Sequence, residues 1–143
     1  MSNPVVLLVD DDPVTLQTWN SILRRRQIPC VATSDARQAL LHFDRHPIRV
    51  LVTDLEMPHL DGIELFRELR SRSPLLRAIL CSGYLDSDNL LSVAEAGFHH
   101  IMPKPIARAA RFSAEVMTQL AQAEHLRDLL LSLRRQSLGT TVA

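Results

Sequence analysis

The sequence is poor in cysteine, glycine and aromatic residues, and it carries no net charge. Cys30 and Cys81 are the only cysteines in 143 residues. Two are too few for a disulfide framework or a paired-cysteine metal site, so we expect a cytoplasmic protein in a reducing environment. The 4 glycines and 8 prolines argue against a collagen-like or disordered chain. Because 16 basic and 16 acidic side chains cancel, we expect no direct binding of nucleic acid.

Long apolar runs are also missing. The first apolar segment covers only residues 5–9 and has no basic stretch before it, which argues against a signal peptide. No segment approaches the roughly 18 consecutive apolar residues of a membrane-spanning helix, so we expect no membrane association. The only basic run, Arg24 to Arg26, lies at the end of a predicted helix, where cations offset the helix dipole.

Short runs rich in Val, Ile and Leu alternate with longer amphipathic segments. The predicted strands span residues 5–9, 29–33, 49–53, 76–80 and 99–102, and the predicted helices span about 13–26, 35–45, 61–71, 87–96 and 106–135. The first, third and fourth strands are continuous apolar runs, as expected for a parallel sheet that helices cover on both faces. The sequence therefore predicts a doubly wound α/β fold.

Capping residues support this segmentation. Asp12 precedes a first-turn proline, and Ser34 or Asp35 precedes the second amphipathic segment. Asp61 is predicted to cap the third helix, and Gly97 suits the left-handed position that ends the fourth helix.

The chemically versatile side chains follow the ends of four predicted strands. They are Asp10, Asp11 and Asp12 after the first strand, Asp54 after the third, Ser82 after the fourth and Lys104 after the fifth. In an open parallel sheet these ends share one edge, which is where ligands bind. Clustered carboxylates repel one another unless they protonate or hold a cation. With oxygen donors and no cysteine or histidine at ligand spacing, the expected ion is Mg²⁺ or Mn²⁺.

Four motifs in this order resemble the receiver domain of two-component response regulators. They are Val-Val-Leu-Leu-Val-Asp-Asp-Asp-Pro, Leu-Val-Thr-Asp-Leu-Glu-Met-Pro-His-Leu-Asp-Gly, Ser-Gly and Met-Pro-Lys-Pro. The likeness covers about residues 4–118. It implies a flavodoxin-like, five-stranded sheet of order 2-1-3-4-5.

The resemblance also implies a role for each matching residue. Asp54 matches the phosphoryl acceptor, a carboxylate nucleophile that attacks a phosphohistidine or a small acyl phosphate. Asp11 matches the direct metal ligand, and the backbone carbonyl of Glu56 matches the remaining protein ligand. Asp10 matches either a ligand acting through water or a base that does not touch the metal. Ser82 resembles the switch hydroxyl, and Lys104 resembles the cation that pairs with the phosphoryl group. The implied partner is a sensor histidine kinase or phosphotransfer protein.

Lys104 is the only lysine in the chain, beside fifteen arginines. A compact ammonium group suits a tight phosphoryl pocket better than a planar guanidinium group does, so site geometry explains this exception. The resemblance implies a cis peptide bond before Pro105.

Two positions depart from the family pattern. Ile101 stands where the family often has an aromatic residue, whose ring moves when the switch hydroxyl moves. Ser82 stands where threonine is commoner, so the hydroxyl is kept and a methyl group is lost. Phe98 is the next aromatic residue and is interpreted as a core ring. Tyr84 and Met57 are interpreted mainly as loop-packing residues that could also gate access to Asp54.

Two other functions remain open. A pseudo-receiver would bind partners without phosphorylation, but a missing acidic pair or lysine would signal it, and both are present here. An aspartate-nucleophile phosphohydrolase would carry Asp-x-Asp, whereas Leu55 and Glu56 follow Asp54 here. We therefore expect a phosphoacceptor signalling domain that dephosphorylates itself slowly and does not turn over an external substrate.

The last predicted helix is longer than one sheet edge requires. We expect a receiver domain over residues 1–118 and a helical extension with a tail over 119–143, either of a stand-alone regulator or of a longer protein. Residues with alternating spacings of four and three form a coiled-coil seam: Phe112, Val116, Gln119, Ala123, Leu126, Leu130 and Leu133. This pattern predicts a homodimer or a signalling linker. An amphipathic helix folded onto its own domain remains the alternative.

Overall fold

Five strands alternate with five helices in residues 3–141, which a computed structural model describes. The strands are β1 (Val5–Val9), β2 (Cys30–Thr33), β3 (Ile48–Thr53), β4 (Arg77–Ser82) and β5 (His100–Pro103). The helices are α1 (Pro13–Arg25), α2 (Ala36–Arg45), α3 (Gly62–Arg72), α4 (Ser87–Ala96) and α5 (Ala109–Thr141). The alternation confirms the predicted α/β class.

The five strands form one parallel sheet in the order β2-β1-β3-β4-β5, as the resemblance implied. Val9 at the end of β1 lies beside Thr33 on one neighbour and Thr53 on the other. The residues that follow β1 and β3 therefore leave the sheet at the same edge. This register brings Asp10 and Asp54 together.

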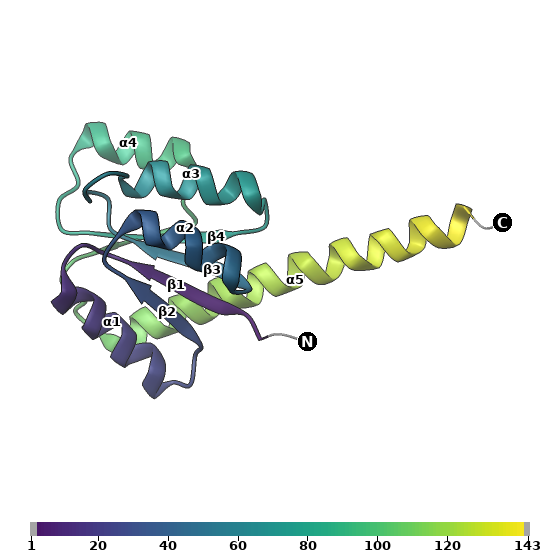
Figure 1. Ribbon diagram of the computed structural model, residues 1–143, viewed down its shortest axis with the longest axis horizontal. Coiled ribbons are helices and arrows are strands. Elements are labelled where there is room, and N and C mark those ends of the chain that lie inside the picture. The colour runs from purple at the N-terminus through teal and green to yellow at the C-terminus, as the bar shows by residue number, and fades with distance from the viewer. Residues whose placement is uncertain (1–2, 142–143) are drawn as a thin grey trace.

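Helices cover both faces of the sheet (Figure 1). On one face, Trp19 of α1 and Phe112 of α5 stack with ring centroids 6.0 Å apart. On the other face, Phe66 and Leu69 of α3 are fully buried against β1 and β3. Burying each such large apolar side chain stabilises the fold by about 2 kcal/mol. The continuous apolar strands are therefore buried between two helical layers.

The predicted helix caps are confirmed. The carboxylates of Asp12 and Asp35 accept hydrogen bonds from backbone N–H groups in the first turns of α1 and α2. Asp61 forms a reciprocal capping box with Glu64 at the start of α3. Gly97 ends α4 with φ of 88°, the left-handed conformation that glycine adopts without a steric penalty.

The bounds of α5 differ from the sequence prediction of 106–135. The helix begins at Ala109 because Ile106 packs against the core from the preceding loop. At its other end α5 runs to Thr141, since the segment contains no proline and its first glycine is Gly139. Despite this length, none of the helices among the described residues has the apolar stretch needed to cross a membrane.

The predicted coiled-coil seam divides into two parts. Its first four members are buried against the domain of the same chain: Phe112, Val116, Gln119 and Ala123. The interpretation that all seven residues face a partner was therefore wrong, because the sheet already covers the first half. Leu126 is half-buried, while Leu130 and Leu133 are exposed where α5 extends beyond the domain (Figure 1). Residues 142 and 143 of the expected tail lie outside the described residues.

Candidate functional site

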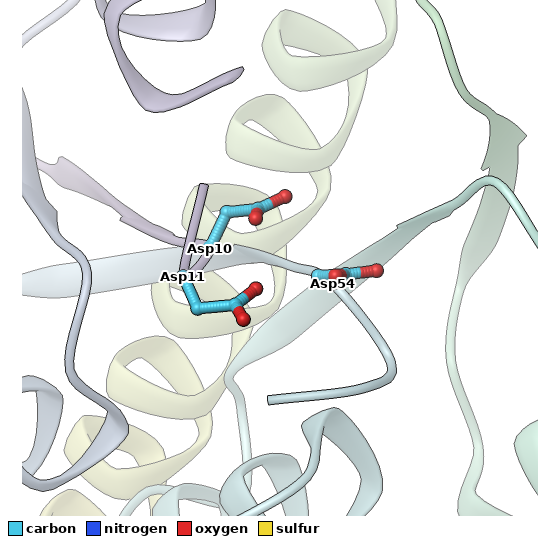
Figure 2. Close-up of side chains that lie close together, drawn as sticks. All are labelled: Asp10, Asp11 and Asp54. Atoms are coloured by element: carbon cyan, nitrogen blue, oxygen red, sulfur yellow. The ribbon is translucent and has the colours of Figure 1, made fainter. Parts of the chain in front are cut away.

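Three carboxylates meet at the carboxyl edge of the sheet. Asp10 and Asp11 follow β1, and Asp54 follows β3 (Figure 2). Each offers one carboxylate oxygen, and these oxygens all lie within 4.8 Å of one another. The structure thus brings together the acidic residues that the sequence analysis assigned to one site.

Lys104 carries the positive charge of this cluster. Its Nζ forms an ion pair with Asp10 and lies 3.2 Å from Oδ2 of Asp54. It also lies 5.7 Å from the ring centroid of Trp19. Burial opposes the charge of Lys104, but the hydrogen bond to Asp10 and the fields of Asp54 and Asp10 raise its pKa. The ammonium group therefore stays charged between the two carboxylates. The Lys104–Pro105 peptide bond is cis, as the resemblance implied.

Asp10 is the most enclosed member of the cluster. Its side chain is fully buried, and its Oδ1 accepts a hydrogen bond of 2.8 Å from the backbone N–H of Asp12. Burial raises the pKa of Asp10, although Lys104 and the Asp12 N–H partly offset this effect. By contrast, Asp11 is exposed at the rim of the site. This contrast is compatible with a direct contact to a bound ion for Asp11 and an indirect one for Asp10.

Asp54 is fixed by its neighbours but remains accessible. Its backbone N–H donates to the carbonyl of Val9 at 3.1 Å, and its Oδ1 accepts from the N–H of Leu55 at 2.8 Å. The side chain keeps 14% of its surface exposed. One carboxylate oxygen is thus held by the backbone, and the other lies beside Lys104.

Gly62 is a contributor to the site that the sequence analysis treated only as part of a turn. A Cβ atom at this position would lie 2.1 Å from the backbone carbonyl oxygen of Asp54. The N–H of Gly62 also donates to the carbonyl of Leu55 at 2.8 Å. Only glycine allows α3 to begin this close to the strand end that carries Asp54. The Asp61–Gly62 pair is the sequence signal that could have indicated this close approach.

Ser82 lies at the end of β4, with its hydroxyl bonded within its own loop. Its Oγ donates to the carbonyl of Tyr84 and accepts from the N–H of the same residue, at 3.2 and 3.3 Å. The carbonyl of Ser82 accepts from the N–H of Lys104 at 3.0 Å, which joins the two loops. Glu56 is exposed in the loop after β3.

The remaining residues singled out in the sequence have structural surroundings. Phe98 packs on Phe66 with ring centroids 4.8 Å apart, which confirms its interpretation as a core ring. Ile101 is partly buried against a small cluster of Leu55, Leu80 and Val93. Met57 packs against the core, whereas Tyr84 is 67% exposed.

The charges and donor atoms of this site fit a divalent cation. Three carboxylates and one ammonium group leave two negative charges without a partner in the cluster. All the available donors are oxygen atoms, which are the ligands of hard ions such as Mg²⁺ and Mn²⁺.

The chain is similar in sequence to known regulatory proteins. The chain is 35% identical over 102 residues to the hydrogenase transcriptional regulatory protein HoxA of Cupriavidus necator, covering 70% of this chain and 21% of HoxA. It is 27% identical over 105 residues to the DNA-binding transcriptional regulator NtrC of Salmonella typhimurium, covering 73% of this chain and 22% of NtrC. The chain thus spans about a fifth of the length of these relatives.

Solved structures share the fold. A CheY-like response regulator receiver domain protein from Methanospirillum hungatei JF-1 has a TM-score of 0.80 at 22% identity, with 87% of this chain and 98% of that chain covered. A receiver domain protein from Clostridium thermocellum has a TM-score of 0.75 at 25% identity, covering 90% and 99%. The family model for the response regulator receiver domain matches residues 6–115, which include all of the strand-end residues described above. The chain therefore belongs to the response regulator receiver domain family.

Proposed function

We propose that this domain receives a phosphoryl group on Asp54 in a reaction that requires Mg²⁺ or Mn²⁺. The observation that carries the proposal is the convergence of Asp54 with Asp10, Asp11 and Lys104 at one edge of the sheet. A carboxylate oxygen of Asp54 attacks the phosphorus atom of a phosphohistidine on a sensor histidine kinase or phosphotransfer protein. The new bond is O–P, the bond that breaks is P–N, and the imidazole leaves with the electron pair.

The surrounding residues stabilise the charge that spreads over the phosphoryl oxygens during transfer. Lys104 pairs with these oxygens, and Ser82 supplies a hydroxyl once it exchanges its contact with Tyr84 for the phosphoryl group. A metal ion bound here supplies further electrostatic stabilisation. Asp11, Asp54 and the backbone carbonyl of Glu56 are the proposed direct ligands, and Asp10 acts through water.

The biological role that we propose is control of a partner or output domain in the cytoplasm. HoxA and NtrC are transcriptional regulators by name, and their receiver-like region makes up only a fraction of each chain. For this chain we propose the signalling step alone, with slow loss of the phosphoryl group and no turnover of an external substrate.

Phosphorylation can be tested with acetyl phosphate and intact-mass spectrometry. In the presence of Mg²⁺ we expect one phosphoryl adduct on the wild-type chain, and none after chelation of the metal or in Asp54→Asn. The matched control is Asp12→Asn, because Asp12 follows the same strand but caps α1. That variant should be labelled normally. An adduct that persists in Asp54→Asn would contradict the assignment of the acceptor.

The same experiment separates the two other functions. If no adduct forms on the folded wild-type chain at any Mg²⁺ concentration, a pseudo-receiver is the better interpretation. If many equivalents of phosphate are released per chain each minute, a phosphohydrolase is the better one.

The proposed set of metal ligands leads to a second, independent prediction. Asp11→Ala removes one of few ligands and should weaken Mg²⁺ binding by about tenfold or more, as losing one charged oxygen ligand does in oxygen-donor sites. Asp12→Ala should bind Mg²⁺ like the wild type and lose only the helix cap, which contributes roughly 1 kcal/mol to stability. Titration calorimetry measures both affinities. Equal Mg²⁺ affinity in wild type and Asp11→Ala would rule out the proposed ligand order.

A further inference from the structure

Trp19 is the single tryptophan of the chain, and it lies in α1 where this helix packs beside α5 on one face of the sheet (Figure 1). The residue is 1% exposed and stacks on Phe112 with an interplanar angle of 20°. Packing in the core therefore fixes the plane of the indole ring.

One face of this ring is turned toward the site. Nζ of Lys104 lies over the ring, 5.7 Å from its centroid. This distance is within the roughly 6 Å at which an aromatic ring attracts an ammonium group, and tryptophan gives the strongest attraction of this kind. The Lys104 side chain is only 18% exposed, so water screens the contact only in part. Trp19 is thus a partner of the ammonium group together with Asp10 and Asp54.

A cavity beside Lys104 leaves room for its side chain to move. The cavity has a volume of about 410 Å³, lies between α1 and the loop after β5, and is lined by both Trp19 and Lys104. Because the four-carbon stem of a lysine is flexible, electrostatic attraction rather than tight packing holds the ammonium group on this side. The relative strengths of its attractions to Asp10, Asp54 and the ring therefore determine where it lies.

The two carboxylates are also the groups that the proposed reaction changes. The carboxylate of Asp54 gives up its own charge when one of its oxygens bonds to phosphorus, and Asp10 is a proposed metal ligand through water. The attraction of both residues for Lys104 therefore changes when the site is loaded. The attraction of the Trp19 ring stays the same, because the ring is neutral and takes no part in the chemistry.

We propose that Trp19 is a positioning residue for Lys104. The indole face holds the ammonium group beside Asp54, in the position from which it pairs with the incoming phosphoryl oxygens. This role requires an electron-rich ring face, which tryptophan, tyrosine and phenylalanine provide and an aliphatic side chain does not. The proposal rests on the proposed phosphorylation of Asp54 and deepens it.

Nuclear magnetic resonance tests the placement of Lys104. Lys104 is the only lysine and Trp19 the only tryptophan of the chain, so selective isotope labelling gives one set of signals for each. In the unphosphorylated wild type we expect the ring current of Trp19 to shift the terminal methylene protons of Lys104 upfield. This shift should disappear in Trp19→Leu. An upfield shift that persists in Trp19→Leu would overturn the proposal.

The rate at which acetyl phosphate labels Asp54 tests the role of the ring. Trp19→Leu should slow labelling by about tenfold, which corresponds to about 1.4 kcal/mol and fits a partly desolvated contact between a cation and an aromatic ring. Trp19→Phe keeps an aromatic face and should recover most of the wild-type rate. Circular dichroism first establishes a temperature at which each variant is folded.

The matched control is Phe66→Leu, which also removes a fully buried ring but on the other face of the sheet. It should be labelled at close to the wild-type rate. If labelling slowed equally in Phe66→Leu and Trp19→Leu, loss of core packing would explain both rates and the positioning role would be wrong.

Fluorinated tryptophan tests the same role with little change in the size of the side chain. Because the chain has one tryptophan, a strain that requires tryptophan replaces Trp19 alone with analogues that carry one, two or three fluorine atoms. Fluorine withdraws electrons from the ring face and weakens its attraction for a cation. We expect the labelling rate to fall stepwise with the number of fluorine atoms. Equal rates for all analogues would contradict positioning by the ring face.

The two proposals fail in different ways. The upfield shift of Lys104 is measured on the unphosphorylated chain, so it decides where the ammonium group lies even if Asp54 is not labelled. A wild-type chain that acquires no phosphoryl group would contradict the proposed function, on which the positioning role rests. A wild-type chain that is labelled no faster than Trp19→Leu would contradict the positioning role alone.

Discussion

At the scale of single residues, the shape of the Lys104 side chain matters as well as its charge. Its ammonium group lies between Asp10 and Asp54 with the Trp19 ring close by, and we expect the larger, planar guanidinium group to fit this position less well. We expect Lys104→Arg to slow labelling of Asp54 by roughly 100-fold, the usual effect of losing one electrostatic contact to the transition state. Time courses of the phosphoryl adduct measure the rate.

The control for this prediction is the reverse exchange at an exposed arginine of the next loop. Arg108→Lys should be labelled at the wild-type rate. If Lys104→Arg were also labelled at that rate, a positive charge at position 104 would be sufficient and the shape of the cationic group would not matter.

His99 makes the stability of the fold sensitive to acid. Its Nδ1 accepts a hydrogen bond of 3.0 Å from the N–H of Ala78, which requires the neutral ring. Partial burial lowers the pKa of His99 from its usual 6.5, and Arg77 and Arg70 nearby add to this effect. The folded state binds the His99 proton more weakly than the unfolded state does. The contribution of His99 to the free energy of unfolding is therefore fully present above about pH 6.5 and is lost as the pH drops below that value.

The corresponding measurement is denaturant unfolding at pH 7.5 and pH 5.5. His99→Asn keeps an acceptor for Ala78 but cannot titrate, so its free energy of unfolding should fall less than that of the wild type between these pH values. An identical fall in both proteins would exclude His99 as the source.

At the scale of elements, α4 is the part of the domain best able to respond to phosphorylation. Only Val93 and Ala96 of this helix are buried. Its carboxyl end is held where Arg70 donates to the carbonyl of Ala96 at 2.7 Å, while its amino end follows the Ser82 loop. Moving the Ser82 hydroxyl toward Asp54 requires the release of Tyr84, which shifts that loop and the start of α4.

We therefore expect a phosphoryl mimic such as beryllium fluoride to change amide chemical shifts mainly from residue 82 to 96 and around Lys104. Ile101 is partly buried against a packed cluster and should change little. The switch is then a shift between two states that the phosphoryl group biases. If the largest rearrangement were at Ile101, the mechanism would resemble the aromatic switch of the family instead.

The sequence predicted the elements and the strand-end residues because both depend on local patterns. Apolar runs identified the strands, and capping residues such as Asp61 and Gly97 identified helix ends. The sequence could not predict how closely segments that are distant in the chain approach one another. Packing, and no local motif, determines the close approach of Gly62 to Asp54. Packing also determines which half of α5 the sheet covers.

At the scale of the whole molecule, the open question is where the folded domain ends along α5. A boundary at residue 118 follows from the family resemblance, but Gln119 and Ala123 are buried and Glu124 pairs with Arg49. Removing residues 119–124 would remove the hydrogen-bond acceptor of Arg77, and a hydrogen bond to a charged group contributes about 1.5–3 kcal/mol. Removing only residues 128–143 touches none of these contacts.

We therefore expect a chain that ends at Arg127 to unfold with a free energy close to that of the full chain. A chain that ends at residue 118 should be less stable by roughly 2–4 kcal/mol, since it loses the Arg77 and Arg49 contacts together with the buried Ala123. Urea unfolding at low micromolar concentration compares the two. The double substitution Arg77→Met with Arg49→Met in the full chain is the matched control, because it removes both polar contacts while keeping α5 intact. If the chain ending at residue 118 were as stable as the one ending at Arg127, the domain would end at 118, and nothing would then hold the second half of α5 at a fixed angle to the sheet.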